Sequence, residues 1–390
     1  MPMPVLFRLS AFVLGVACAA PLAAPLAAQE AAPAPWAAWG EMLFHDTELS
    51  QNGTQSCATC HDPALAFTDP RESQAGRAVS LGDDMTSLGD RNAPTLGYAR
   101  FSPAFGQDGS GIYRGGQFHD GRAKDLTEQA RGPLFNPIEM GLASAGLFAR
   151  RLAENPDQAR LARDLAGIAD PEADPEATLA AATKAIAAFE ATDEFAPFDS
   201  RYDRFLRGEI DLTDEEELGR ILFFSQQFTN CNQCHQLRAT PGEAGETFSN
   251  YQYHNIGVPV NIAARGLNGV ASDFHDQGLL ANPAITDPAQ AGKFKVPTLR
   301  NVAVTGPYMH NGVFSDLRTV ILFYNTYNTK RPERHINPET GKPFAPPEVA
   351  GTLSLKELEI GPALDDQRID ALVAFLKTLT DARYEPLLEP

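Results

Sequence analysis

The sequence predicts a mainly α-helical fold, made of two similar units in tandem with long loops and few short strands. Three observations predict it. The pattern Gly-x-x-Leu-Phe occurs at Gly40–Phe44 and again at Gly219–Phe223, and each copy is followed by a polar loop and then Cys-x-x-Cys-His. Apolar residues recur at helical spacing in three stretches. Glycine and proline are frequent from 235 to 300, which predicts long loops there.

The three helical stretches set the expected domain organisation. Residues 174–195 and 214–224 show helical spacing with few helix breakers, and a last helix is expected around 365–379. That last helix carries Ile369, Leu372, Phe375, Leu376 and Leu379 on one face. We expect the boundary between the units near 198–213, with a first domain at 29–205 and a second at 206–390.

Residues 1–28 have the composition of a secretory signal peptide. Arg8 is their only charge, and an apolar run covers 11–20, ahead of small residues that offer a cleavage site. Lipoprotein processing at Cys18 is a weaker alternative, because Gly15 stands where a leucine is expected. No other apolar stretch approaches the roughly twenty residues of a membrane span. These features predict export to the periplasm.

The net charge of −18 limits the classes of partner. Such an acidic chain is not expected to bind nucleic acid. It can attract a basic partner protein, although an acidic surface that only keeps the protein soluble explains the charge equally well.

Two copies of Cys-x-x-Cys-His use four of the five cysteines. They are Cys57, Cys60 and His61 in the first copy, and Cys231, Cys234 and His235 in the second. This pattern attaches a c-type haem: the two thiols add to the haem vinyl groups, and the histidine binds the iron. Two disulfides, or one zinc site with four cysteine ligands, are the alternatives, but neither explains why a histidine follows each pair. We therefore expect two covalently bound haems.

An amide and a carboxylate lie ten residues apart around a Gly-Pro break, at Gln129 and Glu139. A haem with an open face can take peroxide, whereas a haem with two strong protein ligands carries electrons. A carboxylate over an open face can move a proton between the peroxide oxygens, and an amide can hold the peroxide by hydrogen bonds. Taken alone, Glu139 would more often be a surface carboxylate.

From about Gly40 to Leu379 the chain resembles the bacterial di-haem cytochrome c peroxidases, in their MauG-like subgroup. Besides the two haem motifs, the resemblance rests on six short sequence motifs: Arg91–Thr95, Asp120–Arg122, Glu128–Ala130, Glu139–Gly141, Val296–Asn301 and Pro307–Gly312. The resemblance implies two cytochrome c-like domains. It also implies reduction of H2O2 to water at the N-terminal haem, with electrons from a small c-type cytochrome or a cupredoxin entering through the C-terminal haem.

The same resemblance implies site residues. Residues matching Gln129 and Glu139 lie in the distal pocket of the first haem. A calcium ion lies between the domains, and its protein ligands match the Asn92 side chain and the carbonyl groups of Thr305 and Pro307. Such oxygen donors suit Ca2+, with waters completing the shell.

Two features separate the subtypes of this family. Many members carry a histidine ligand of the first iron on the loop before the Arg91–Thr95 motif. The corresponding loop here, residues 81–90, has no histidine, and Met85 is the one residue in it that could bind the iron instead. We therefore expect an open or water-bound first haem. Tyr324 stands where many members have a methionine ligand of the second iron, and we expect it to be the distal ligand there. As a hard anion it would lower the haem potential. The alternative is a tyrosine that only packs.

One position departs from the family. His119 stands where a tryptophan usually relays electrons between the haems, and an imidazole is much harder to oxidise than an indole. We expect His119 near the haems, where it bridges propionates or, as an alternative, binds iron. Arg265 and Arg300 are further candidates for pairing with propionates. His254 is expected to be a capping or surface residue.

Three functions are therefore open. The first is a periplasmic peroxidase that uses a cytochrome or copper protein as its donor. The second is a MauG-like oxidase that modifies tryptophan or tyrosine of a partner protein. The third is a di-haem electron carrier without turnover. The sequence leaves a homodimer open.

Overall fold

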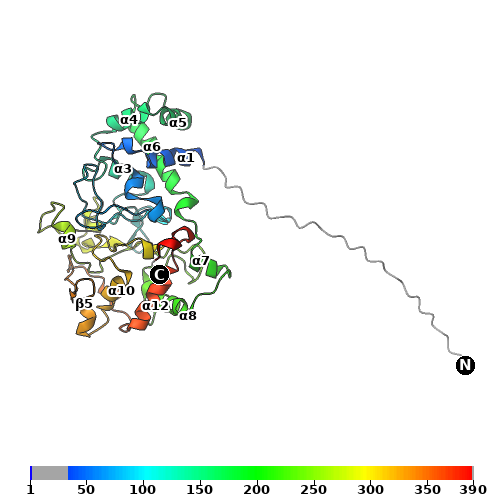
Figure 1. Ribbon diagram of the computed structural model, residues 1–390, viewed down its shortest axis with the longest axis vertical. Coiled ribbons are helices and arrows are strands. Elements are labelled where there is room, and N and C mark those ends of the chain that lie inside the picture. The colour runs from blue at the N-terminus through cyan, green and yellow to red at the C-terminus, as the bar shows by residue number, and fades with distance from the viewer. Residues whose placement is uncertain (2–33, 389–390) are drawn as a thin grey trace. The chain divides into compact units, whose positions relative to one another are not determined.

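The computed structural model describes Met1 and residues 34–388 (Figure 1). The predicted signal peptide, with Cys18, lies outside the described residues, apart from Met1. Residues 34–388 belong to one compact unit, so the domain boundary at 205/206 stays a prediction. No helix within the described residues is long and apolar enough to cross a membrane.

The described chain is mainly helical, as predicted. Its first half contains α1 (Pro35–Phe44), α2 (Cys57–Cys60), α3 (Leu126–Phe135), α4 (Ala145–Glu154), α5 (Pro156–Ala166) and α6 (Pro175–Glu190). Its second half contains α7 (Arg201–Leu206), α8 (Asp214–Phe223), α9 (Ile262–Arg265), α10 (Leu317–Asn325), α11 (Leu355–Leu358) and α12 (Asp366–Lys377).

Strands are few and short. Three antiparallel pairs of two-residue strands occur among the described residues: β1 (Gly106–Gln107) with β2 (Tyr113–Arg114), β3 (Tyr253–His254) with β4 (Phe294–Lys295), and β5 (Ile336–Asn337) with β6 (Lys342–Pro343). Between residues 235 and 300 the only α-helix is α9, which confirms the loops predicted from glycine and proline.

The three predicted helices correspond to α6, α8 and α12, and each begins at a side-chain cap. Asp174 accepts a hydrogen bond from the backbone of Ala177 at the start of α6, and Asp365 caps α12 in the same way. Thr213 and Glu216 form a reciprocal capping box at α8. The five apolar residues predicted to share a face near the C-terminus are all buried.

The two copies of the Gly-x-x-Leu-Phe pattern lie in equivalent pairs of packed helices. Helix α1 crosses α6 at Gly40, and α8 crosses α12 at Gly219, so each helix pair lies together (Figure 1). A Cβ atom at Gly40 would lie 1.9 Å from the carbonyl oxygen of Ala185, and a Cβ atom at Gly219 would lie 1.9 Å from that of Ala371. Glycine is therefore required at both crossings, because any side chain would collide with backbone.

Each helix pair has its own apolar core. Trp39, Phe148 and Ile186 belong to the core formed by α1 and α3–α6. Phe223 and Phe375 belong to the core around α8, α10 and α12, where their ring centroids lie 5.2 Å apart. These two cores hold the segments that line the site described next.

Candidate active site

The residues of the two haem motifs, the predicted pocket and calcium residues, His119 and Tyr324 all line one cavity of about 520 Å³. They are Cys57, Cys60, His61, Asn92, His119, Gln129, Glu139, Cys231, Cys234, His235, Thr305, Pro307 and Tyr324. They come from eight separate segments of the chain, so the fold gathers residues that the sequence could only assign one by one.

The first Cys-x-x-Cys-His motif forms a single helical turn. Helix α2 spans the two cysteines, and His61 at its C-terminal end donates its backbone N–H to Cys57 over 2.9 Å. The Nδ1 atom of His61 donates to the carbonyl oxygen of Phe67 over 3.1 Å. Burial lowers the pKa of His61, which keeps the imidazole neutral. Its Nε2 atom is therefore left as a lone-pair donor for a metal.

The second motif has the same geometry. The backbone N–H of His235 donates to Cys231 over 2.9 Å, and its Nδ1 atom donates to the carbonyl oxygen of Phe248 over 3.1 Å. Burial lowers the pKa of His235 to about 4. Phe67 and Phe248 both adopt a positive φ, of 57° and 55°, which turns each carbonyl group toward its histidine. Both histidines are thus prepared to bind iron through Nε2.

The cysteines fit covalent haem better than the alternatives. All four have free thiols, so neither motif forms a disulfide. Burial raises the pKa of Cys60 and of Cys234 to about 12, so both thiols are neutral in the protein chain alone. Within residues 34–388 no three His, Cys, Asp or Glu side chains cluster to hold a metal ion. Neutral thiols beside a cavity suit addition to a porphyrin.

The predicted peroxide-binding residues lie where α3 ends. Gln129 is on α3, which contains Pro133 and ends at Phe135. The chain then turns, and the backbone N–H of Glu139 donates to the carbonyl oxygen of Asn136 over 3.0 Å. This turn brings the carboxyl group of Glu139 to the same cavity as Gln129.

Burial raises the pKa of Glu139, and the nearby cation of Arg122 partly opposes this shift. Arg122 also lines the cavity, with its guanidinium 3.8 Å from the ring centroid of Phe118 and 2.8 Å from Asp120. Arg122 was not among the predicted site residues, because only the folded chain brings it near Glu139. A carboxyl group with a raised pKa can exchange protons close to neutral pH.

Tyr324 lies on α10 and lines the cavity beside the second motif. Its hydroxyl group makes no hydrogen bond to any described residue. Burial raises its pKa, and negative charge on Cys234 or Cys231 would raise it further, which shows how close these side chains lie. A buried tyrosinate at this position therefore needs a nearby positive charge such as a ferric iron.

Met85 does not reach the cavity. Its side chain is 55% exposed, and it does not belong to the cavity wall. The loop is instead fixed by Asp83, which accepts hydrogen bonds from the hydroxyl groups of Ser50 and Thr54 over 2.7 and 2.6 Å. This geometry favours the interpretation of Met85 as an exposed loop residue.

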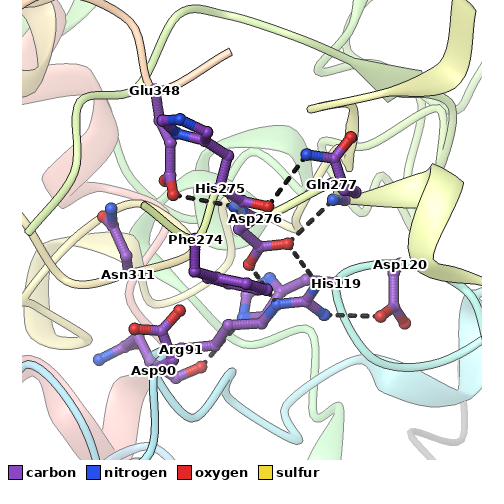
Figure 2. Close-up of polar contacts among 12 residues, drawn as sticks. Asp90, Arg91, His119, Asp120, Phe274, His275, Asp276, Gln277, Asn311 and Glu348 are labelled. Atoms are coloured by element: carbon purple, nitrogen blue, oxygen red, sulfur yellow. Dashed lines mark hydrogen bonds and ion pairs between the residues drawn. The ribbon is translucent and has the colours of Figure 1, made fainter. Parts of the chain in front are cut away.

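Arg91 forms ion pairs with Asp120 and Asp276, which lie far from it in the sequence (Figure 2). Arg91 donates to both oxygens of Asp276, each over 2.7 Å, and to Asp120 over 2.7 Å. Arg91 also lines the cavity. The Arg91 pairs hold the loop that carries Asn92 against the second half of the chain.

His119 lies beside the ion pairs of Arg91 (Figure 2). Its Nε2 atom donates to the backbone oxygen of Asn92 over 2.9 Å, and burial lowers its pKa to about 4. Its ring centroid lies 6.5 Å from that of His310, which stacks on Phe294 at 3.6 Å. Since Nε2 is already a donor to backbone, the geometry favours a positioning role for His119 over iron ligation.

The predicted calcium ligands lie on the same wall. Asn92 donates through Nδ2 to the carbonyl oxygen of Ala78 over 3.0 Å, which leaves its Oδ1 as an acceptor. Thr305 and Pro307 also line the cavity. Neutral amide and carbonyl oxygens are donors that suit Ca2+, and calcium at this place stays a prediction.

The two arginines suggested for haem propionates have other partners. Arg300 is 1% exposed and pairs with Asp203, while Arg265 pairs with Asp90 and Glu348. Neither arginine lines the cavity. These ion pairs favour structural roles for both arginines, because the sequence does not show which carboxylate each arginine meets after folding.

Three further residues line the cavity although the sequence did not predict them there. Lys295 donates through Nζ to the carbonyl oxygen of Gly116, and burial lowers its pKa to about 7. His254 lines the cavity with a buried Nε2 that lacks a partner among the described residues, so it is not the surface or capping residue expected. Glu190 also lines the cavity. None of the three lies in a motif that spacing alone could single out.

Comparison with known proteins identifies the family. Residues 34–211 match the model of the di-haem cytochrome c peroxidases. The chain is 57% identical to the methylamine utilization protein MauG of Paracoccus denitrificans, over 97% of this chain and 98% of that protein. It is 29% identical to the cytochrome c551 peroxidase of Nitrosomonas europaea, over 90% of this chain and 82% of that protein.

A solved structure of a di-haem peroxidase has a similar fold. The di-haem peroxidase BthA from Burkholderia thailandensis matches with a TM-score of 0.81 and 34% identity, covering 92% of this chain and 89% of that one. The chain therefore belongs to the di-haem cytochrome c peroxidase family, which includes the MauG proteins. Membership implies two c-type haems and an oxidoreductase of the peroxidase or oxidase type.

Proposed function

We propose that this chain is a peroxide-dependent di-haem oxidase whose electrons come from tryptophan or tyrosine side chains of a partner protein. The observation that supports the proposal is Tyr324, which lines the cavity close to Cys231 and Cys234 of the second haem motif. A tyrosinate ligand lowers the potential of that haem, which makes it a poor electron acceptor from a high-potential donor. The relative at 57% identity is a MauG protein, which supports the same choice.

The protein residues have separate tasks in this proposal. When bound, the haems supply iron centres that accept the oxidising equivalents of H2O2. Glu139 as a carboxylate would take the proton of the peroxide oxygen that is retained and give it to the other oxygen, which leaves as water. Gln129 donates a hydrogen bond that holds the peroxide or the water. His61 and His235 donate Nε2 lone pairs, and their Nδ1 hydrogen bonds fix the ring orientation.

We also propose a periplasmic location and a bound calcium ion. The signal-peptide pattern of residues 1–28 supports export to the periplasm. A calcium ion at Asn92, Thr305 and Pro307 would tie the loop after Arg91 to the second half of the chain. Through Asn92 that ion would also hold His119 in place, because the two residues share a 2.9 Å hydrogen bond.

Reduction of H2O2 with electrons from a small c-type cytochrome or a cupredoxin is the second candidate function. His119 favours it, because the oxidase needs to move electrons out of a partner protein, and an imidazole is a poor hopping site for them. Relatives named cytochrome c551 peroxidase also match, at 29% and 28% identity. A di-haem carrier without turnover is disfavoured by Gln129 and Glu139 on the cavity wall.

Stopped-flow spectroscopy separates these candidates. The resting, fully oxidised holoprotein is mixed with H2O2, and reduced cytochrome c is then added. We expect a long-lived oxidised state that the cytochrome does not discharge. Fast oxidation of the cytochrome would instead establish the peroxidase. The absence of any spectral response to H2O2 would contradict both and leave the electron carrier.

A further inference from the structure

Glu190 is a buried carboxyl group with no partner in its surroundings. It is the last residue of α6 and is only 2% exposed, yet it lines the cavity. Its Oε2 atom is fully buried and makes no hydrogen bond to any described residue. A carboxyl group placed this way costs folding free energy, so it calls for an explanation.

The second half of the molecule shows that the fold does not need this carboxyl group. Gly40 contacts Ala185 and Phe189 on α6 in the same way as Gly219 contacts Ala371 and Phe375 on α12. The residue after each phenylalanine is therefore equivalent. In α6 that residue is Glu190. In α12 it is Leu376, which is 4% exposed and lines the same cavity.

Glu190 lies at the edge of the first haem site. Negative charge on Glu190 would raise the pKa of Cys57, the first attachment cysteine. The preceding residue, Phe189, packs on Phe44 and Phe195 with ring centroids 5.4 and 5.1 Å away, and Cys57 packs against the same cluster. A change in charge at the first haem is therefore felt by Glu190 through an apolar, poorly screening medium.

No nearby charge holds Glu190 in one protonation state. Glu41 and His45, on the side of α1, are exposed. Arg100 donates to the carbonyl oxygen of Ala191, next to Glu190, and to the carboxylate of Asp193. Burial alone raises the pKa of Glu190 to about 8. The C-terminal end of α6 also disfavours an anion there.

We propose that Glu190 is the proton-coupling residue of the first haem, binding one proton from solvent when that haem gains one electron and releasing it when the electron leaves. The electron comes from an external one-electron donor, so charge balances in each direction. The carboxylate is favoured beside the ferric haem, because the oxidised site carries one more positive charge. The inference rests on the proposed first haem, but not on peroxide or on any partner protein.

An equilibrium redox titration of the holoprotein tests this, because it needs no turnover. The midpoint potential of the first haem is measured between pH 5 and 9 by following its absorbance. In the wild type we expect the potential to fall as pH rises, with a slope of up to about 59 mV per pH unit, since one proton per electron changes the equilibrium tenfold per unit. In Glu190→Gln, and in Glu190→Leu, which copies Leu376, the slope is expected to vanish.

A matched control and a second measurement complete the test. Glu154→Gln changes the exposed last residue of α4 and should keep the wild-type slope. The reduced-minus-oxidised infrared difference spectrum of the wild type should show a carboxylic acid C=O band that Glu190→Gln lacks. The proposal is overturned if Glu190→Gln keeps the slope or the band. It is also overturned if the wild type shows neither, a result that does not depend on how any variant folds.

Discussion

The two haem regions of this molecule share a scaffold and differ in the side chains that complete it. In each, a helix crosses another at a glycine, and a histidine donates through Nδ1 to a phenylalanine carbonyl group over 3.1 Å. In the first region the cavity wall has the amide of Gln129 and the carboxyl groups of Glu139 and Glu190. In the second it has Tyr324 and, in place of Glu190, Leu376.

This comparison teaches that the helix pairs fix where a haem binds, whereas a few residues decide what it does. Gln129 and the carboxyl groups of Glu139 and Glu190 line the cavity on the side of the first motif. The wall near the second motif has Tyr324 and apolar side chains, together with His254 and Glu357, whose charges would act on His235 and Cys234. Tyr324 can stabilise an oxidised iron. Substitutions at these few positions should therefore separate chemistry from scaffold.

Removing the proton carrier of the first region should have the largest effect. Glu139→Gln is expected to lower the rate constant for reaction with H2O2 by about 10²–10⁴-fold, because general base help is lost. Burial raises the pKa of Glu139, and the reaction needs its carboxylate, so the wild-type rate should fall as pH drops through that raised pKa. Stopped-flow absorbance measures both.

Glu128→Gln is the control for this variant, since Glu128 is an exposed carboxylate on the same helix. It should leave the rate within about twofold of wild type. An equal loss in both variants would show that Glu139 is not the proton carrier.

The shared scaffold predicts equal damage at its two crossings. Gly40→Ala and Gly219→Ala should each lower the free energy of unfolding by at least about 1–3 kcal/mol, because the new methyl group would lie 1.9 Å from a backbone oxygen. Denaturant titration followed by circular dichroism measures this. Gly109→Ala, where nothing lies within 4 Å, should cost much less. A clear difference between the first two variants would break the equivalence of the helix pairs.

Tyr324→Phe should change only the second region. Loss of the oxygen ligand is expected to alter the low-spin haem signals in electron paramagnetic resonance and to raise that haem's midpoint potential, since the ferric state loses its anionic partner. The signals of the first haem should stay as they are. An unchanged low-spin spectrum would remove Tyr324 from the iron coordination.

The smallest effect is expected at Met85. Because its side chain is 55% exposed and outside the cavity wall, Met85→Leu should leave the resting spectrum of the first haem and its reaction with H2O2 unchanged. A new high-spin signal in this variant would show that Met85 binds the iron of the resting protein.

Much of the scaffold could be predicted from the sequence. The repeated Gly-x-x-Leu-Phe pattern predicted two similar units, and in the structure each of its glycines lies where two helix backbones approach too closely for any side chain. Helical spacing predicted α6, α8 and α12, because burial of one face leaves a period in the sequence. The partners of Arg265 and Arg300 could not be predicted, since each meets a carboxylate that is far away along the chain.

The sequence by itself determined the two haem attachment motifs and the helices beside them, because covalent attachment and helix packing each need particular residues at short, fixed spacings. Only the tertiary structure decided that Arg122 lies near Glu139, that Lys295 and His254 face the cavity, and that Glu190 is buried without a partner. Charge interactions and burial depend on distances in space, and those distances are set by loops whose sequences carry no period.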